Sequence, residues 1–233
     1  MKILANDGIS NSGIAALENA GFEVLTTNVA QEQLVNYINE NDVVGLLVRS
    51  ATQVRKELID SCPGLKLIGR GGVGMDNIDV DYARGKGLHV INTPAASSES
   101  VAELVFAHLF GGVRFLYDAN RNMPLEGDKS FKKLKKSYAK GAELRGKALG
   151  IIGFGRIGRA TARIGLGIGM EVIFHDPFIE EAEIDLSFFD GQELSFSFKC
   201  MPKEEVLSKA DFISLHVPAQ KEYIIGRSEF EMM

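Results

Sequence analysis

The feature that most constrains the fold is a glycine motif between an apolar run and an amphipathic segment. Residues 148–153, ALGIIG, are typical of a buried parallel strand, and Gly153, Gly155 and Gly158 have the spacing G-x-G-x-x-G. The following segment, residues 156–169, places apolar side chains at helical intervals. A strand, a tight turn and a helix in this order predict an α/β domain whose loop receives phosphates at the helix N-terminus.

Each residue of this predicted loop has a separate role. Gly153 permits the tight turn, Gly155 lets the backbone approach a pyrophosphate, and Gly158 lets the helix pack closely on the strand. Asp176 follows the next predicted strand, residues 171–175, where its carboxylate can accept hydrogen bonds from an adenosine ribose and would repel a 2′-phosphate. The sequence therefore predicts NAD as the cofactor. The alternative is that Asp176 only caps a turn or forms an ion pair.

The first ninety residues alternate short apolar runs with amphipathic stretches, the pattern of βα units around a parallel sheet. The predicted strands are residues 2–6, 22–26, 43–48, 65–70 and 88–92. The predicted helices are residues 10–20, 31–39 and 55–60. An open parallel sheet binds ligands outside the carboxyl ends of its strands, so we expect ligand contacts in the loops that follow them. A third strand of the second series is predicted over residues 211–216.

A lysine-rich stretch, residues 127–140, follows a predicted long helix over residues 97–117. Its lysines are Lys129, Lys132, Lys133, Lys135, Lys136 and Lys140. A nucleic-acid surface is one interpretation, but the chain has 26 Lys and Arg against 31 Asp and Glu, a net charge of −5. Aromatic residues that could stack on bases are limited to Phe131 and Tyr138. We therefore interpret the stretch as a solvated, mobile connector and expect no nucleic-acid partner.

The sequence LSFFDGQELSFSFKC, residues 186–200, predicts a β-hairpin that turns at Asp190-Gly191. Alternation places Leu194, Phe196 and Phe198 on one face, which we interpret as packing rather than a ligand site. The hairpin carries no residue pattern typical of chemistry. We expect it to be a decoration or a contact with a partner.

Cysteine content and hydropathy exclude several classes of protein. Cys62 and Cys200 are too few for a disulfide framework, and with four scattered histidines they predict no metal site. The N-terminus turns polar too early for a signal peptide, and no apolar run has the length of a membrane span. We therefore expect a cytoplasmic protein that does not cross a membrane.

Six short motifs along the chain resemble those of one family. They are VRSAT at residues 48–52, GRGGVGMDNID at 69–79, VINTP at 90–94, IIGFGRIGR at 151–159, HDP at 175–177 and LHVP at 215–218. Together and in this order they resemble the D-2-hydroxyacid dehydrogenases, most closely the phosphoglycerate dehydrogenase branch. The resemblance implies a flavodoxin-like substrate-binding domain over residues 1–94. It also implies that residues 95–233 form part of a Rossmann NAD-binding domain, with parallel sheets in both.

The resemblance also assigns ligand contacts. The backbone of Gly71, Gly72 and Val73 faces the substrate carboxylate and the nicotinamide. The implied cofactor contacts outside the glycines are Val73, Arg156, Ile157, Asp176, His216, Val217 and Pro218. The helix over residues 97–117 resembles the segment that forms the family's dimer contact, so a homodimer is implied.

Arg49 and Arg70 are the candidates for binding anionic groups of the substrate. Each ends a predicted strand and precedes small residues, Ser50 in one case and Gly71-Gly72 in the other, which leave room for a ligand. A guanidinium suits phosphate and carboxylate because its N–H groups form a planar fork. The alternative is that both arginines pair with surface carboxylates.

The family's activity implies NAD-dependent oxidation of 3-phosphoglycerate, the first step of serine biosynthesis, or of another D-2-hydroxy acid. The family's catalytic Arg, Glu and His have no match in this chain, so we predict no catalytic residue in it. We interpret His216 as lying beside the cofactor rather than as a replacement for the catalytic histidine.

The strand count supports the same expectation. A full dinucleotide domain has about six strands, and we expect residues 148–153 to lack a neighbouring strand on one side. We therefore expect this chain to be part of a longer protein and to show no turnover alone. The alternative function is a catalytically inactive NAD-binding or dimerisation module.

Overall fold

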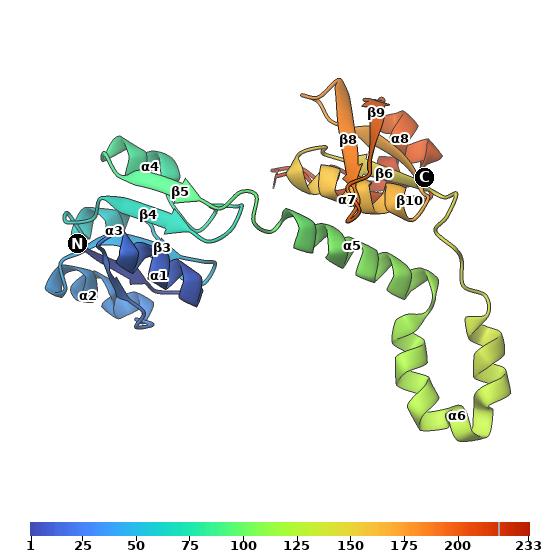
Figure 1. Cartoon of the computed structure of the whole chain (residues 1–233), viewed down its shortest axis with the longest axis horizontal. Coiled ribbons are helices and arrows are strands. Elements are labelled where there is room, and N and C mark those ends of the chain that lie inside the picture. The colour runs from blue at the N-terminus through green and yellow to red at the C-terminus, as the bar shows by residue number, and fades with distance from the viewer. Residues whose placement is uncertain (219) are drawn as a thin grey trace. The chain divides into compact units, whose positions relative to one another are not determined.

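The computed structural model describes residues 1–218 and 220–233, which form two compact units, Met1–Ser97 and Ser98–Met233. Each unit has its own parallel sheet (Figure 1). The division falls at Ser97/Ser98, three residues beyond the boundary expected at residue 94. The predicted α/β class with parallel sheets is confirmed.

The first unit has a five-stranded sheet in the order β2-β1-β3-β4-β5, which is the flavodoxin-like order. Its strands are β1 (Lys2–Ala5), β2 (Glu23–Leu25), β3 (Val43–Val48), β4 (Leu67–Arg70) and β5 (His89–Asn92), all paired in parallel. Its helices are α1 (Asn11–Asn19), the 3-10 turn η1 (Gln31–Gln33), α2 (Leu34–Glu40), α3 (Lys56–Ser61) and α4 (Val80–Gly85). All five predicted strands are confirmed, β3 with the predicted bounds and the others with ends that differ by at most two residues.

Local sequence explains most of these elements. The Ser10 hydroxyl accepts a hydrogen bond from the Gly13 N–H at 3.2 Å and so caps α1. Strand β3, VVGLLV, is apolar along its whole length because helices cover both faces of a parallel sheet. Helix α4, six residues long, is the one helix of this unit that the sequence did not predict.

The second unit has a three-stranded parallel sheet in the order β10-β6-β7. Its strands are β6 (Ala148–Ile152), β7 (Glu171–His175) and β10 (Phe212–Leu215). The expectation that residues 148–153 lack a neighbour on one side is wrong, because β10 pairs with β6 on the side opposite β7. Helix α8 (Lys203–Lys209) packs on β6 and returns the chain to this side of the sheet.

Two long helices precede this sheet, α5 (Ser98–Val113) and α6 (Leu116–Tyr138). The single helix predicted over residues 97–117 is wrong, because Phe115 adopts a left-handed backbone conformation, φ 54°, that ends α5 and starts α6. The expectation of a mobile connector over residues 127–140 is also wrong, because most of this stretch is helical. Lysine has a high helix propensity, and α6 runs through most of this stretch with a break in helical geometry at Ser130.

Among the described residues, no single helix is both long enough and apolar enough to cross a membrane. The pair α5 and α6 meets the length and composition criteria only when taken together, with a bend of 54° between the two helices.

The predicted hairpin is confirmed as β8 (Glu181–Ser187) and β9 (Glu193–Lys199), which pair antiparallel. The turn contains Asp190 and Gly191, and Gly191 takes a φ of 85° that few residues other than glycine adopt. The first strand begins five residues earlier than expected. Packing is confirmed for Phe198, whose ring lies 6.4 Å from that of Phe154, whereas Leu194 and Phe196 are exposed.

The remaining helices of the second unit are α7 (Arg156–Gly167) and α9 (Arg227–Phe230). Its core includes the stacked rings of Phe154 and Phe174, whose centroids are 4.0 Å apart. Phe154 comes directly after the turn glycine that follows β6, and Phe174 lies in β7. This pair fixes the start of the glycine loop against the neighbouring strand.

Candidate functional site

The glycine loop leaves β6 and enters α7, as the sequence predicts. Gly153 has a φ of +91°, and a Cβ there would lie 2.5 Å from the His216 carbonyl oxygen. A Cβ at Gly158 would lie 2.3 Å from the Gly153 carbonyl oxygen. Gly155 differs, because a Cβ there would meet no atom within 4 Å. Two glycines are therefore required for packing, and the third borders open space.

The N-terminus of α7 has free hydrogen-bonding capacity. Gly155 is the N-cap residue, so no side chain caps the helix. The first helical bond runs from the Arg159 N–H to the Gly155 carbonyl, at 2.9 Å. The N–H groups of Arg156, Ile157 and Gly158 precede that bond, and the helix dipole adds positive potential at the same place. The loop can therefore bind an anion through its backbone.

Asp176 lies against this loop. One carboxylate oxygen accepts the Phe154 N–H at 2.7 Å, and the other accepts the Phe178 N–H at 2.9 Å. The side chain is only half-buried, and each carboxylate oxygen can accept a further hydrogen bond. The hydrogen bond to Phe178 agrees with the alternative that Asp176 caps a turn. The position of Asp176 beside the glycine loop agrees with the predicted contact to a ribose.

Cys200 holds the backbone of Asp176. Its Sγ accepts the Asp176 N–H at 3.4 Å and lies 3.3 Å from the Asp176 carbonyl oxygen. The neighbouring His175 places its Nδ1 atom 2.8 Å from the Met201 carbonyl. The segment that follows β9 thus fixes the chain where β7 ends.

The segment after β10 completes this group of loops. The His216 carbonyl and a Val217 methyl both lie against Gly153, and Pro218 is exposed beside them. The His216 ring turns toward α7 instead, with its Nε2 atom 2.9 Å from the Ser214 hydroxyl and 3.2 Å from the Thr161 hydroxyl. Burial lowers the pKa of His216 below its ordinary value. His216 therefore contacts the glycine loop through its backbone and not through its ring.

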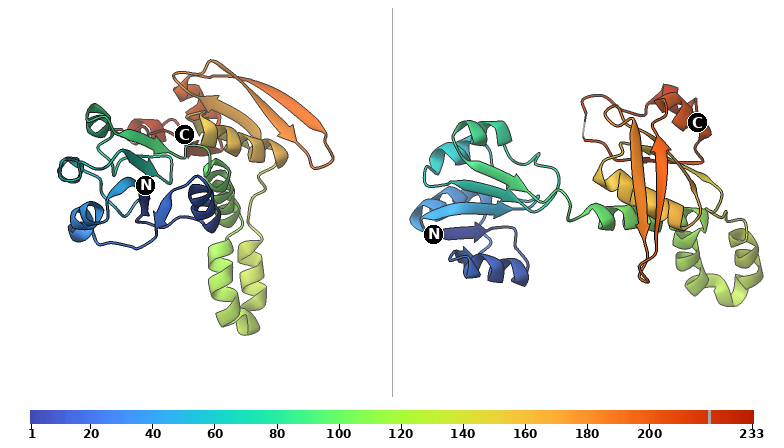
Figure 2. Two further views of the ribbon diagram at one scale, coloured as in Figure 1. Left: turned by 60° about the vertical axis from the view of Figure 1, so that its left-hand side comes forward. Right: turned by 45° about the horizontal axis from the view of Figure 1, so that its top comes forward.

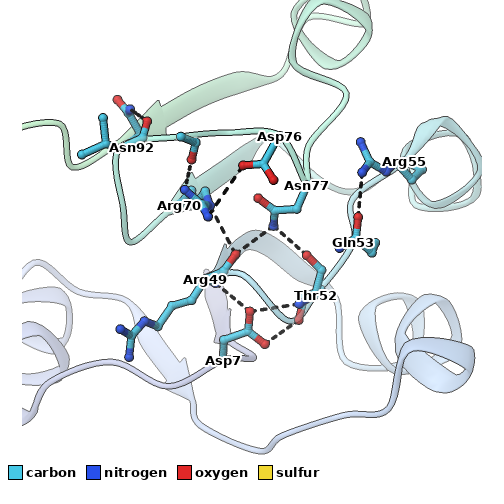
Figure 3. Close-up of polar contacts among 11 residues, drawn as sticks. Asp7, Arg49, Thr52, Gln53, Arg55, Arg70, Asp76, Asn77 and Asn92 are labelled. Atoms are coloured by element: carbon cyan, nitrogen blue, oxygen red, sulfur yellow. Dashed lines mark hydrogen bonds and ion pairs between the residues drawn. The ribbon is translucent and has the colours of Figure 1, made fainter. Parts of the chain in front are cut away.

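The first unit has a second group of loops at the carboxyl ends of its strands (Figure 3). Asp7, after β1, accepts the Arg49 N–H at 2.6 Å, the Thr52 N–H at 3.1 Å and the Thr52 hydroxyl at 2.6 Å. Burial alone would raise the pKa of Asp7, but these hydrogen bonds and one from the Ala51 backbone outweigh it and lower the pKa. Asp7 is therefore a charged anchor for the loop after β3.

Two buried asparagines extend this network. Asn77 donates from Nδ2 to the carbonyls of Arg49 at 2.8 Å and Thr52 at 2.7 Å, while its Oδ1 atom has no partner among the described residues. Asn6 donates to the Thr52 hydroxyl at 2.9 Å. The sequence reasoning missed Asn6, Asp7 and Asn77. The sequence offered a signal for all three, since Asn6 ends a predicted strand, Asp7 directly follows it, and Asn77 belongs to the motif GRGGVGMDNID.

The two candidate arginines differ in their surroundings. The Arg70 guanidinium donates to the Gly74 carbonyl and to the Arg49 carbonyl, and it lies 3.9 Å from the Asp76 carboxylate (Figure 3). Its side chain is only 13% exposed. Arg49 is exposed and extends away from the network in Figure 3, and its guanidinium has no partner within residues 1–218 and 220–233. Arg70 therefore supports the loop of residues 71–76, and Arg49 is free to meet an anion.

The loop after β4 is held from its other side as well. The Asn92 amide donates to the Val73 carbonyl at 2.7 Å, and the Thr93 N–H donates to the Gly72 carbonyl at 3.2 Å. A Cβ at Gly72 would lie 3.0 Å from Arg70 Nη1, so a larger residue there would push the Arg70 guanidinium aside slightly. Gly71 and Ser50 are exposed at the strand ends beside Arg49.

In the described part of the chain, no three His, Cys, Asp or Glu side chains lie close enough together to hold a metal ion.

Residues 3–221 match the family described as D-isomer specific 2-hydroxyacid dehydrogenase, catalytic domain. The D-3-phosphoglycerate dehydrogenase of Methanocaldococcus jannaschii is 39% identical over 235 residues, which cover 100% of this chain and 42% of that protein. The hydroxypyruvate reductase of Thermotoga maritima is 37% identical, over 100% of this chain and 70% of that protein. The chain therefore spans less than half the length of the first of these relatives.

A solved structure agrees with these sequences. The cofactor-bound, NAD+-containing 3-phosphoglycerate dehydrogenase of Entamoeba histolytica is 28% identical and superimposes with a TM-score of 0.72. The alignment covers 100% of this chain and 68% of that one. Because the family match extends over nearly the whole chain, the resemblance seen in the six motifs is confirmed. The chain belongs to the D-isomer specific 2-hydroxyacid dehydrogenase family.

Proposed function

We propose that this chain provides the NAD-binding loop and the substrate-anion site of a dehydrogenase that oxidises 3-phosphoglycerate to its 2-keto acid. The observation that carries the proposal is the glycine loop with the Asp176 carboxylate bonded to the Phe154 N–H. The glycine loop follows β6, which has β7 on one side and β10 on the other. Open α/β sheets bind ligands at such a point, where the strand order reverses.

The residues at this loop suit a dinucleotide. The open space at Gly155 and the uncapped N–H groups of Arg156 and Ile157 would hold the pyrophosphate. Asp176 would accept the ribose hydroxyls, and its charge disfavours the additional phosphate of NADP. Val217 and Pro218, the His216 backbone, and Val73 in the other unit are the remaining proposed contacts. NAD supplies the hydride acceptor, while these residues bind and orient it.

The proposed substrate contacts lie in the first unit. Arg49 would bind a carboxylate or phosphate through its free guanidinium, and the small residues Ser50, Gly71 and Gly72 leave space beside it. Arg70 would act through the loop that it supports. The name of the first relative favours a phosphorylated substrate.

Two alternatives have specific support. A different D-2-hydroxy acid, or its keto form, agrees with the hydroxypyruvate reductase relative. A catalytically inactive NAD-binding or dimerisation module agrees with the absence of any assigned proton-transfer residue among those described. A homodimer, a cytoplasmic location and a place at the first step of serine biosynthesis complete the proposal and rest on family membership.

The test combines binding with turnover on the 233-residue chain. Calorimetric titration with NAD measures binding, and the absorbance of NADH formed with 3-phosphoglycerate or D-lactate measures turnover. We expect NAD to bind without turnover, because no catalytic residue is assigned in this chain, and measurable turnover would contradict that expectation. No binding of NAD would contradict the proposal.

Arg49→Ala tests the substrate class. We expect a larger loss of affinity for 3-phosphoglycerate than for unphosphorylated D-glycerate, on the order of tenfold, because a charge-assisted hydrogen bond contributes about 1.5–3 kcal/mol. Lys66→Ala is the control, because Lys66 is exposed just before β4, at the opposite end of the same sheet. An equal effect on both acids would remove phosphate recognition from Arg49.

A further inference from the structure

The end of the hairpin formed by β8 and β9 lies against the residue proposed to bind the adenosine ribose. Cys200 directly follows β9, and its Sγ atom lies 3.4 Å from the Asp176 nitrogen and 3.3 Å from the Asp176 carbonyl oxygen. A thiol can accept one hydrogen bond and donate another, so Cys200 can pair with the N–H and the carbonyl of the same residue. The hairpin therefore supplies a partner for both main-chain polar groups of Asp176.

The position of the Asp176 main chain decides where its carboxylate lies. The pairing of β6 with β7 ends at Ile152 and His175, so Asp176 is one residue beyond the sheet. Its carboxylate oxygens accept the N–H groups of Phe154 at 2.7 Å and Phe178 at 2.9 Å. These bonds set the direction of the carboxylate, whereas its distance from the glycine loop depends on the main chain. A shift of that main chain would therefore move the carboxylate away from a bound ribose.

The main chain around Cys200 is itself held on two sides. The Cys200 N–H donates to the Glu180 carbonyl at 2.7 Å and so closes the base of the hairpin. The Met201 N–H donates to the Phe174 carbonyl in β7 at 2.9 Å. The thiol is therefore attached to a fixed segment, and it can hold Asp176 in one place.

A second contact joins the hairpin to the glycine loop. Arg159 of α7 donates from Nε to the Phe154 carbonyl and from Nη1 to the Glu183 carbonyl in β8, both at 3.2 Å. Its guanidinium lies 5.6 Å from the centre of the Phe154 ring, and the Phe198 ring of β9 lies 6.4 Å from the same ring. Figure 2 shows the hairpin projecting beyond the rest of its unit. Its inner part thus contacts the glycine loop as well as Asp176.

We propose that Cys200 is a positioning residue for NAD, which acts by holding the main chain of Asp176. This role rests on the NAD-binding function proposed above, and it gives a use to a hairpin that the sequence leaves as a decoration or a contact with a partner. Cys200 acts on the cofactor through Asp176, because the thiol determines how the carboxylate is presented to the ribose hydroxyls. The affinity of the chain for NAD therefore depends on a hydrogen-bonding side chain at residue 200.

The test is calorimetric titration of the full chain with NAD. Cys200→Ala and Cys200→Val both remove the hydrogen-bonding group, and valine keeps most of the side-chain volume. We expect each to weaken NAD binding about three- to tenfold, because the lost bonds are between neutral groups. Cys200→Ser should retain more affinity than either, because a hydroxyl also donates and accepts. Equal losses in the serine and alanine variants would overturn the proposal.

The matched control is Ser195→Ala, in the same strand. The Ser195 hydroxyl donates to the Asp185 carboxylate at 2.6 Å, so this variant also removes a hydrogen bond of the hairpin. We expect its NAD affinity to equal that of the wild type, because Asp185 lies in β8, away from the hairpin end that holds Asp176. A loss as large as that of Cys200→Ala would show a general effect of the hairpin and overturn the specific role of Cys200.

A double-mutant cycle separates positioning from a merely structural effect. We expect Cys200→Ala to have little further effect on NAD affinity when Asp176→Ala is already present, because Cys200 acts through that carboxylate. A structural effect would instead weaken binding by the same factor in both backgrounds, and that result would overturn the proposal. Far-UV circular dichroism shows whether each variant is folded, and Cys200→Val replaces Cys200→Ala in the cycle if the alanine variant is not.

Amide hydrogen exchange of the cofactor-free chain adds a readout that does not need NAD. We expect faster exchange at Asp176 and Phe154 in Cys200→Ala, with no change at Leu149 in the middle of β6. Unchanged exchange at Asp176, or faster exchange with unchanged NAD affinity, would overturn the role of Cys200 and leave the NAD site in place. A wild-type chain that does not bind NAD would instead contradict the proposed function and this role with it.

Discussion

The two groups of loops at the strand ends are built by opposite means. In the first unit, side chains hold the loops, because Asp7, Thr52 and Asn77 tie the segments after β1, β3 and β4 together. In the second unit the loops pack directly through their backbones. This close approach is possible because Gly153 and Gly158 have no side chain. The first arrangement depends on hydrogen bonds that can be removed, and the second on space that can be filled.

This difference predicts different costs for small substitutions. Truncating a buried amide removes its hydrogen bonds and leaves their partners unpaired, at about 1–3 kcal/mol. Adding a methyl group where a carbonyl lies within 2.5 Å displaces backbone, which cannot move as a flexible side chain would. Glycine positions in the second unit should therefore be the most sensitive sites.

The largest effect is expected for Gly153→Ala and Gly158→Ala. Each should lower the free energy of unfolding of the second unit by about 3 kcal/mol or more, from collision with backbone and, at Gly153, from the positive φ. Gly155→Ala is the matched control, because its Cβ meets nothing within 4 Å. It should fold normally yet bind NAD more weakly. Denaturant unfolding followed by hydrogen exchange resolves the two units and measures the free energy of unfolding of each. An equal loss of this free energy in all three glycine variants would contradict the prediction.

A smaller effect is expected for Asn77→Ala in the first unit. It should lower the free energy of unfolding of this unit by about 2 kcal/mol, because the carbonyls of Arg49 and Thr52 lose their donor. Asn39→Ala removes a single bond, to the Ser61 carbonyl, at an exposed position, and should cost less than about 1 kcal/mol. The same hydrogen-exchange measurement compares the two variants. Similar costs would show that the network does not hold the loops.

The smallest effect concerns pH and His216 in the second unit. Its pKa is lowered in the folded state, so below the ordinary value of about 6.5 the unfolded chain binds a proton first. The free energy of unfolding should therefore fall as pH decreases below that value. His216→Gln should reduce this dependence, whereas the control His89→Gln, at an exposed strand position, should not. Unfolding curves between neutral and mildly acidic pH measure the slope, and an unchanged slope in His216→Gln would contradict the account.

The sequence was sufficient for features that depend on local pattern. Apolar runs predicted the strands, and the spacing of Gly153, Gly155 and Gly158 predicted the turn and the helix that follow β6. The position of Asp176 after β7 was predicted for the same reason, since the carboxyl ends of parallel strands share one edge of the sheet.

Features that depend on long-range contact could not be predicted. The pairing of β10 with β6 joins residues about sixty positions apart, with the hairpin between them. Arg70 and Arg49 look alike in sequence, yet the carbonyls of Gly74 and Arg49 attract one guanidinium inward and leave the other free. The left-handed conformation of Phe115 also breaks a helix that its apolar period favours.

The central claim is that the second unit binds NAD through its glycine loop and Asp176. Calorimetric titration of the wild type and of Asp176→Ala with NAD and NADP tests it most directly. Asp190→Ala is the control, because Asp190 accepts an N–H two residues on, at 3.1 Å, in the same kind of turn. We predict that the wild type prefers NAD and that Asp176→Ala weakens NAD binding about ten- to a hundredfold and loses the preference. Unchanged NAD affinity in Asp176→Ala would contradict the claim.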